Sequence, residues 1–164
     1  LTDCVPGEFV ATGSTTSSDR VCGNCALGVN YSSENNADSC TDVTAACDES
    51  TSYESTTAAV TNDRVCSALT DCVPGEFVEM APTASSDRIC GDCTLGLDYS
   101  TDINAANCTA LSDACDTATS YESIAAAVTN DRVCTSLTDC VPGEYIATGS
   151  TTSSDRVCGD CAFG

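Results

Sequence analysis

The sequence has no histidine, lysine or tryptophan, and only eight of its 164 residues are phenylalanine or tyrosine. Histidine and lysine are the side chains that most often act as general bases or activate nucleophiles. Large aromatic and aliphatic side chains normally build a core, whereas much of the apolar fraction here is alanine, valine and cysteine. We therefore expect that the protein is not an enzyme and binds no cofactor. We also expect that a conventional hydrophobic core is not what stabilises its fold.

Positive charge is also scarce, because five arginines stand against 25 acidic residues and the net charge is −20. Such a chain repels polyanions, which excludes nucleic acid and anionic membrane surfaces as partners of this segment. The acids are spread along the chain without the Asp-x-Asp-x-Asp-Gly order of a calcium loop. We expect a solvated acidic surface and no metal site.

Cysteine is abundant, and its spacing repeats every 68 residues. Two full sets of six cysteines and the start of a third follow the same offsets. They are Cys4, Cys22, Cys25, Cys40, Cys47 and Cys66, then Cys72, Cys90, Cys93, Cys108, Cys115 and Cys134, then Cys140 and Cys158. Because 15 cysteines in a short chain are typical of oxidising compartments, we expect a disulfide framework and an extracellular location, secreted or at the cell surface.

The same period divides the chain into repeat 1 at 1–68, repeat 2 at 69–136 and a partial repeat 3 at 137–164. The chain begins without methionine and stops within a repeat, so we expect it to be a segment of a longer array. Cys161 matches Cys25 and Cys93, whose expected partners lie 15 residues further on, beyond Gly164. We therefore do not interpret Cys161 as a reactive thiol.

Each full repeat contains three cysteine loops, which we call its first, second and third modules. In the first module, Val5-Pro6-Gly7-Glu8 is typical of a turn, and 8–12 carries residues that favour a strand. The small polar residues 13–18 predict a hairpin tip, and 19–22 a returning strand. The fold expected is small, disulfide-rich and mainly β, with tandem cysteine-rich hairpin modules stacked into an elongated rod.

Two disulfide schemes fit these spacings. Pairing of adjacent cysteines closes the base of each loop, whereas an interlaced scheme joins Cys25 to Cys47 and Cys40 to Cys66. Six cysteines allow 15 connectivities, so the sequence alone leaves the scheme open. Loops of this size contribute about 3 kcal/mol each in the chain-entropy model, enough to replace the missing core.

A Cys-Gly-x-Cys motif recurs at 22–25, 90–93 and 158–161. Alone it indicates an oxidoreductase or half of a zinc site, but these need a helix N-terminus or a second ligand pair nearby. The sequence offers neither, which favours two disulfides meeting at a module junction.

All five arginines follow an aspartate and precede the last cysteine of a loop by two residues. They are Arg20, Arg64, Arg88, Arg132 and Arg156. We interpret them as structural residues that form ion pairs with acids on the adjacent strand or lie across the aromatic ring of the module. A guanidinium also relieves repulsion in an acidic module. A less favoured alternative has them meet acids on a neighbouring copy.

Two Asn-x-Ser/Thr patterns, at Asn30 and Asn107, predict N-glycosylation. They are not equivalent positions, because Asn30 aligns with Asp98 and Asn107 with Ser39. Serine and threonine clusters at the hairpin tips are also typical of O-glycosylation. We expect covalent glycans on this chain.

The string from Cys4 through Gly7 and Phe9 to Asp19-Arg20-Val21-Cys22 resembles the cysteine-rich repeats of tumour-necrosis-factor receptors. It is also similar to the repeats of ephrin receptors and of repetitive protist and algal surface proteins. The string recurs from Cys72 and from Cys140. The resemblance implies an elongated, ladder-like extracellular array of β-hairpin modules.

Near-identical modules give a periodic surface, which suits self-association better than recognition of one ligand. The sequence therefore predicts a structural subunit of an extracellular filament, appendage or coat, glycosylated and associating with like copies into a fibre. The alternative is a ligand-binding or adhesive ectodomain stalk of a receptor-like surface protein.

Overall fold

The computed structural model describes residues 1–162, so the last two residues of the partial third repeat lie outside it. Its regular structure consists of antiparallel two-stranded sheets, each a hairpin. First modules contain β1 (Glu8–Thr12) with β2 (Val21–Asn24), β7 (Glu76–Met80) with β8 (Ile89–Asp92), and β13 (Glu144–Thr148) with β14 (Val157–Asp160). Second modules contain β3 (Asn30–Tyr31) with β4 (Thr41–Asp42), and β9 (Asp98–Tyr99) with β10 (Thr109–Ala110). Third modules contain β5 (Ser52–Thr56) with β6 (Val65–Ala68), and β11 (Ser120–Ile124) with β12 (Val133–Ser136). The small, disulfide-rich, mainly β class predicted from the sequence is confirmed.

The first-module hairpin follows from its local sequence. The Glu8 N–H donates to the Val5 carbonyl at 2.9 Å, which closes a turn in which Gly7 has φ +92°, a conformation that favours glycine. The first strand covers the five predicted residues, but the second begins at Val21 instead of Asp19. A register shift between Val10 and Thr12 marks a β-bulge near the tip.

Sulfur takes the place of an ordinary core. Cys4 and Cys72 are completely buried, and Cys25 and Cys93 are nearly so. Among the described residues, Leu137 is the one large aliphatic side chain that is buried, at 9 % exposed. Many other valine, isoleucine and leucine side chains, such as Val21, Leu95 and Ile103, are more than half exposed, which agrees with the shortage of core-forming residues in the sequence.

The contacts divide the chain into two units. Unit 1 is Leu1–Thr70 with Ala81–Arg88, and unit 2 is Asp71–Met80 with Ile89–Gly164. This division follows packing, because the hairpin tip 81–88 of the second repeat contacts a module of the first. The repeats at 1–68, 69–136 and 137–164 remain a division of the sequence.

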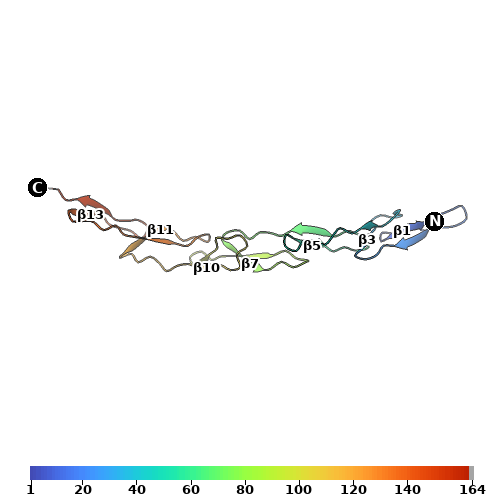
Figure 1. The fold of residues 1–164 in the computed structure, drawn as a ribbon, viewed down its shortest axis with the longest axis horizontal. Coiled ribbons are helices and arrows are strands. Elements are labelled where there is room, and N and C mark those ends of the chain that lie inside the picture. The colour runs from blue at the N-terminus through green and yellow to red at the C-terminus, as the bar shows by residue number, and fades with distance from the viewer. Residues whose placement is uncertain (163–164) are drawn as a thin grey trace. The chain divides into compact units, whose positions relative to one another are not determined.

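In unit 1 the hairpins follow one another in chain order from β1 to β5 (Figure 1). The tip of each later module folds back onto the strand of the module before it. The backbone N–H groups of Val10, Ser32 and Glu54 donate to the carbonyls of Ala37, Val60 and Ala84 at 2.8–2.9 Å.

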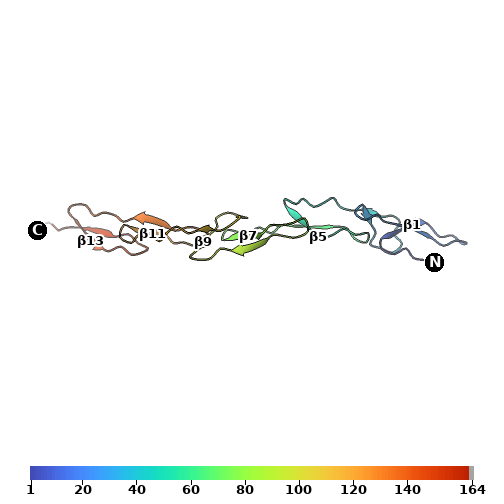
Figure 2. The same cartoon turned by 90° about the horizontal axis from the view of Figure 1, so that it is seen from below.

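Unit 2 repeats this arrangement, with β7, β9, β11 and β13 in chain order (Figure 2). The N–H groups of Val78, Ser100 and Glu122 donate to the carbonyls of Ala105, Val128 and Thr152, again at 2.8–2.9 Å. We call each such bond a tip bond. One backbone interaction therefore joins successive modules in both units, whatever the side chains at the tip are.

Candidate functional site

The disulfides close every hairpin at its base, with Cα atoms 5.5–5.7 Å apart. Of the two schemes left open by the spacing, the structure has adjacent pairing. The bridges are Cys4–Cys22, Cys25–Cys40, Cys47–Cys66, Cys72–Cys90, Cys93–Cys108, Cys115–Cys134 and Cys140–Cys158. Within residues 1–162, Cys161 is a free cysteine, and its side chain is exposed.

The Cys-Gly-x-Cys motif joins two different bridges. Cys22 pairs back to Cys4, and Cys25 pairs forward to Cys40. Sulfurs of bridged cysteines also lie within 4.8 Å of a carboxylate, as at Glu8. A bridged sulfur is not a thiolate, which is the form of cysteine that binds metals and attacks substrates.

The glycine of this motif makes room for the module's aromatic ring. Phe9 pairs with Gly23 across the hairpin, and a Cβ atom on Gly23 would lie 2.6 Å from Cε1 of Phe9. Phe77 and Gly91 repeat the contact at 2.8 Å. The aromatic ring thus lies over the glycine that adjoins the last cysteine of the loop.

Each first and third module is also closed by an aspartate, an arrangement we call the Asp clasp. The carboxylate accepts two hydrogen bonds from a threonine or serine at the start of the module, one from its backbone N–H and one from its hydroxyl. The pairs are Asp19 with Thr2, Asp63 with Thr44, Asp87 with Thr70, Asp131 with Ser112, and Asp155 with Thr138. The Asp clasp ties the two ends of a loop together beside the disulfide.

These bonds favour the ionised carboxylate and therefore lower its pKa. For Asp19 the N–H and hydroxyl of Thr2 lower the pKa from 3.8 to about 2. For Asp63 the hydroxyl of Thr44 is the largest cause, followed by its N–H. The sequence indicated a structural role for the arginine of the Asp-Arg pair and gave no signal for the aspartate, whose partner lies 17–19 residues away.

The arginines lie beside the clasps with largely covered side chains. Arg20 approaches Asp3 at 3.6 Å and donates to Asn36, and Arg132 approaches Glu122 at 3.9 Å. The Nε atoms of Arg64 and Arg132 are buried without a hydrogen bond. The predicted structural role of the five arginines, Arg156 included, stays a prediction that these contacts support.

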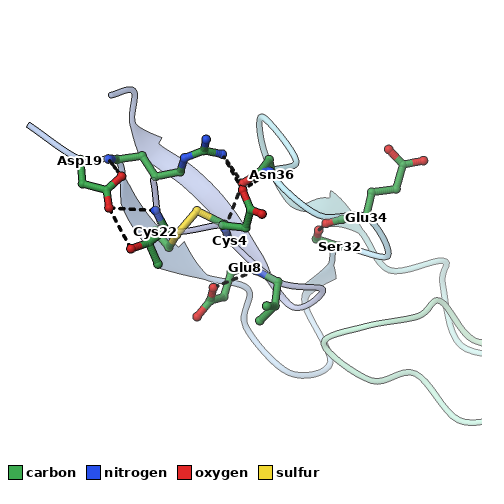
Figure 3. Close-up of a disulfide and its surroundings, with 11 residues drawn as sticks. Cys4, Glu8, Asp19, Cys22, Ser32, Glu34 and Asn36 are labelled. Atoms are coloured by element: carbon green, nitrogen blue, oxygen red, sulfur yellow. Dashed lines mark hydrogen bonds and ion pairs between the residues drawn. A yellow bond between two sulfur atoms is a disulfide. The ribbon is translucent and has the colours of Figure 1, made fainter. Parts of the chain in front are cut away.

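Asn36 is the central residue of the junction between the first and second modules (Figure 3). Its Oδ1 accepts from the Cys4 N–H at 2.9 Å and also from Arg20, its Nδ2 donates to Asp3, and its N–H donates to the Cys4 carbonyl. It adopts φ +57°, which asparagine tolerates better than most residues. Asn104 repeats the bonds around Cys72. Its recurrence 68 residues later was the one signal in the sequence that could have indicated this role.

The predicted glycosylation sites lie in different surroundings. Asn30 lies in β3, where its Oδ1 accepts from the Ala26 N–H at 2.8 Å, and Asp98 makes the same bond to Thr94. Asn107 is exposed and lies in a bend before β10. The structure therefore gives Asn30 a backbone partner and leaves Asn107 at the surface.

Asn107 lines a hollow of about 360 Å³ in the second module of repeat 2, and the equivalent hollow in repeat 1 measures about 320 Å³. Hydroxyl and carboxylate groups dominate both linings. The first contains Ser100, Thr101, Asp102 and Thr109, and the second Ser32, Ser33, Glu34 and Thr41. No sequence pattern pointed to these hollows, because the loop that forms them is shaped by the bonds of Asn36 and Asn104.

Comparison with known proteins gives a limited likeness. No protein-family model matches the chain, and no curated protein matches it in sequence. Among solved structures, a chain of the human RANKL/OPG complex is 21 % identical, with 82 % of this chain and 88 % of that chain covered and a TM-score of 0.34. A chain in the mouse RANKL-OPG complex is 21 % identical over 65 % of this chain and 88 % of that one, with a TM-score of 0.35.

Equine lentivirus receptor 1 is 19 % identical over 71 % of this chain and all of that chain, also with a TM-score of 0.35. Likeness at this level carries no argument about what the present chain binds. No helix among residues 1–162 is long and apolar enough to cross a membrane.

Proposed function

We propose that this chain is a structural subunit of an extracellular filament, appendage or coat, glycosylated and assembled from like copies. The observation that carries the proposal is the tip bond. It recurs between successive modules in both units and uses only backbone atoms. Modules can therefore be added to an array without a new interface for each addition, as in other repeat proteins.

The disulfides and Asp clasps support the same proposal. Every described loop from Cys4 to Cys158 is closed covalently, and each first and third module adds a clasp. Such modules need no large core and resist unfolding from their ends, which suits an exposed extracellular polymer. We assign the chain no catalytic role, because the sequence has neither histidine nor lysine.

Contact between like copies is supported by exposed aliphatic side chains at one repeated position. The residue before the last cysteine of each first and third module is 44–57 % exposed. These residues are Val21, Val65, Ile89, Val133 and Val157. A periodic series of apolar side chains is matched best by an equally periodic partner, which another copy of the chain provides.

Electron microscopy of natively isolated, unreduced material tests the proposal. We expect long fibres whose axial period corresponds to one 68-residue repeat or a simple multiple, and we expect thiol treatment to dissolve them. In a recombinant chain, Val65→Thr and Val133→Thr keep side-chain shape and should weaken association, while Thr57→Val at an exposed tip serves as a control. Dispersed particles in native material would instead favour the stalk of a receptor-like or adhesive surface protein.

A further inference from the structure

We propose that the hollow of the second module in repeat 2 seats the innermost sugar of an N-glycan carried by Asn107, and that Asn30 carries none. This inference rests on the extracellular location in the proposed function. It concerns a modification site, and the ligand is an N-linked N-acetylhexosamine.

The side chain of Asn30 has a structural role in the fold. Its Oδ1 accepts from the Ala26 N–H at 2.8 Å, and Asp98 in repeat 2 accepts from the Thr94 N–H in the same way. An aspartate has no amide nitrogen to glycosylate, so what the two repeats share at this position is the acceptor oxygen. Ser32, the hydroxyl residue of the Asn30 pattern, is 4 % exposed and donates to the Glu34 carbonyl at 3.2 Å.

Asn107 has the opposite surroundings. It is exposed, and it lies outside the strands, directly before a cysteine that is bridged to the nearly buried Cys93. Thr109, the hydroxyl residue of its pattern, pairs with Tyr99 in the sheet and is itself exposed. The fold therefore holds the backbone of this pattern firmly and leaves its side chains open to solvent.

The hollow beside Asn107 has the chemistry that a sugar needs. Its volume is about 360 Å³, and it is lined by Ser100, Thr101, Asp102, Ala105, Asn107 and Thr109. Hydroxyls both donate and accept hydrogen bonds and a carboxylate accepts them, which matches the hydroxyls and acetamido group of an N-acetylhexosamine. Asn104 keeps the wall in place through its bonds to Cys72.

The chemical step belongs to a glycosyltransferase of the secretory pathway that uses a lipid-diphosphate-linked oligosaccharide. The Nδ2 atom of Asn107 forms a bond to the anomeric carbon, the bond from that carbon to the diphosphate oxygen breaks, and the lipid diphosphate leaves with the electron pair. One amide proton is lost to a base of the transferase. The chain itself supplies only the acceptor amide and, after folding, the hollow.

Repeat 1 provides a matched test, because its hollow is equivalent and the residue at the place of Asn107 is Ser39. Ser39 is followed by Cys40 and Thr41, so Ser39→Asn creates the same pattern in the same surroundings. The full chain and its variants are secreted from eukaryotic cells and analysed by peptide mass spectrometry. We expect one N-glycan in the wild type, none in Asn107→Gln, an unchanged glycan in Asn30→Asp, and two glycans in Ser39→Asn.

Seating in the hollow is tested by release of the glycan with an endoglycosidase that cuts within its inner core. We expect release from the folded chain to be at least tenfold slower than from the reduced, unfolded chain, and faster in the folded Thr101→Ala/Asp102→Ala variant. Equal release from folded and unfolded wild type, a bare Asn107, or a glycan at Asn30 overturns the inference.

The same native preparation separates this inference from the proposed function. Fibres in the microscope together with an unmodified Asn107 would overturn the proposed glycan site and support the proposed filament. Dispersed particles together with a glycosylated Asn107 would support the glycan site and overturn the filament.

Discussion

The first and third modules of unit 1 share one hairpin register but protect their disulfides differently. Both place a bulge before the tip and both have an Asp clasp. In the first module Cys4 is completely buried and bonded to Asn36, whereas in the third Cys66 is exposed. The hairpin, bridge and clasp are therefore sufficient for a module, and burial of the bridge is an addition made by the module that follows.

The residue opposite the aromatic ring differs in the same way. Phe9 faces Gly23 in the first module, and Tyr53 faces Ser67 in the third. A Cβ atom at Gly23 would lie 2.6 Å from the Phe9 ring, so the first module requires glycine there, whereas the third module has a serine at the same place. Residues that are the same in both modules are thus those that the hairpin requires. Residues that differ are those that each junction between modules requires.

Removing a bridge should have the largest effect on stability. In unit 2, Cys72→Ala/Cys90→Ala and Cys115→Ala/Cys134→Ala each release a loop of similar length, worth about 3 kcal/mol in the chain-entropy model. The first variant should lose about 1 kcal/mol more, because Cys72 is completely buried and its removal leaves a cavity. Denaturant unfolding of both variants measures the difference.

Partial reduction followed by alkylation checks the same comparison without mutation. The third-module bridge should be reduced first, since Cys134 is exposed while Cys72 is buried. Labelling of Cys90 before Cys134 would contradict the role that we give to burial.

Substitution of Asn36 should have the next largest effect on stability. Asn36→Gly keeps the backbone at φ +57° but removes the side-chain bonds to Cys4, Asp3 and Arg20, and we expect a loss of about 2 kcal/mol. Asn35→Gly, at an exposed neighbouring position, controls for the added flexibility of glycine. Hydrogen exchange should show faster exchange of the Cys4 amide in the first variant and no change in the second.

Substitution of the glycine opposite the aromatic ring should have a smaller effect on stability. Gly23→Ala forces the ring of Phe9 to move and should cost about 1–2 kcal/mol. Phe9→Leu in the same chain should recover part of this loss, whereas Phe9→Leu alone should destabilise, and the double-mutant cycle measures the coupling. Additive effects of the two substitutions would show that the ring and the glycine do not interact.

Much of the hairpin was predictable because its determinants are local. Val5 to Glu8 specify a turn, and Glu8 to Thr12 specify the strand that the structure has. The returning strand was predicted two residues too early, because the Asp19 carboxylate bonds to Thr2 and to the Arg20 N–H instead of leaving these residues in the ladder. That interaction spans 17 residues, and no local pattern reveals it.

The junctions were not predictable for the same reason. Asn36 bonds to Cys4 across 32 residues, and each tip bond joins backbone atoms whose side chains differ between modules. The choice between adjacent and interlaced disulfides also depends on three-dimensional closeness and not on spacing. The sequence therefore indicated the modules and their fold class, while the surfaces between modules, where the hollows lie, required the structure.

The smallest effect that we predict concerns pH and the Asp clasps. Their carboxylates have pKa values below the ordinary 3.8, about 2 for Asp19, because threonine and serine donors favour the ionised form. A folded-state pKa that is lowered contributes stability that is fully present above pH 3.8 and is lost as the pH falls through the folded value. The thermal midpoint should therefore be constant at neutral pH and fall between pH 3.8 and about pH 2.

Thr44→Val tests this at a single clasp. Valine keeps the shape of threonine but removes the hydroxyl that is the largest cause of the lowered pKa of Asp63, so that pKa should rise toward 3.8. Thr44→Ser keeps a hydroxyl and should leave it lowered. Because the N–H of residue 44 still donates to the carboxylate, part of the shift should persist in the valine variant. Carboxyl-carbon NMR titration reads the pKa of Asp63 directly, and identical titration curves for the two variants would mean that the side-chain bond does not hold the clasp closed.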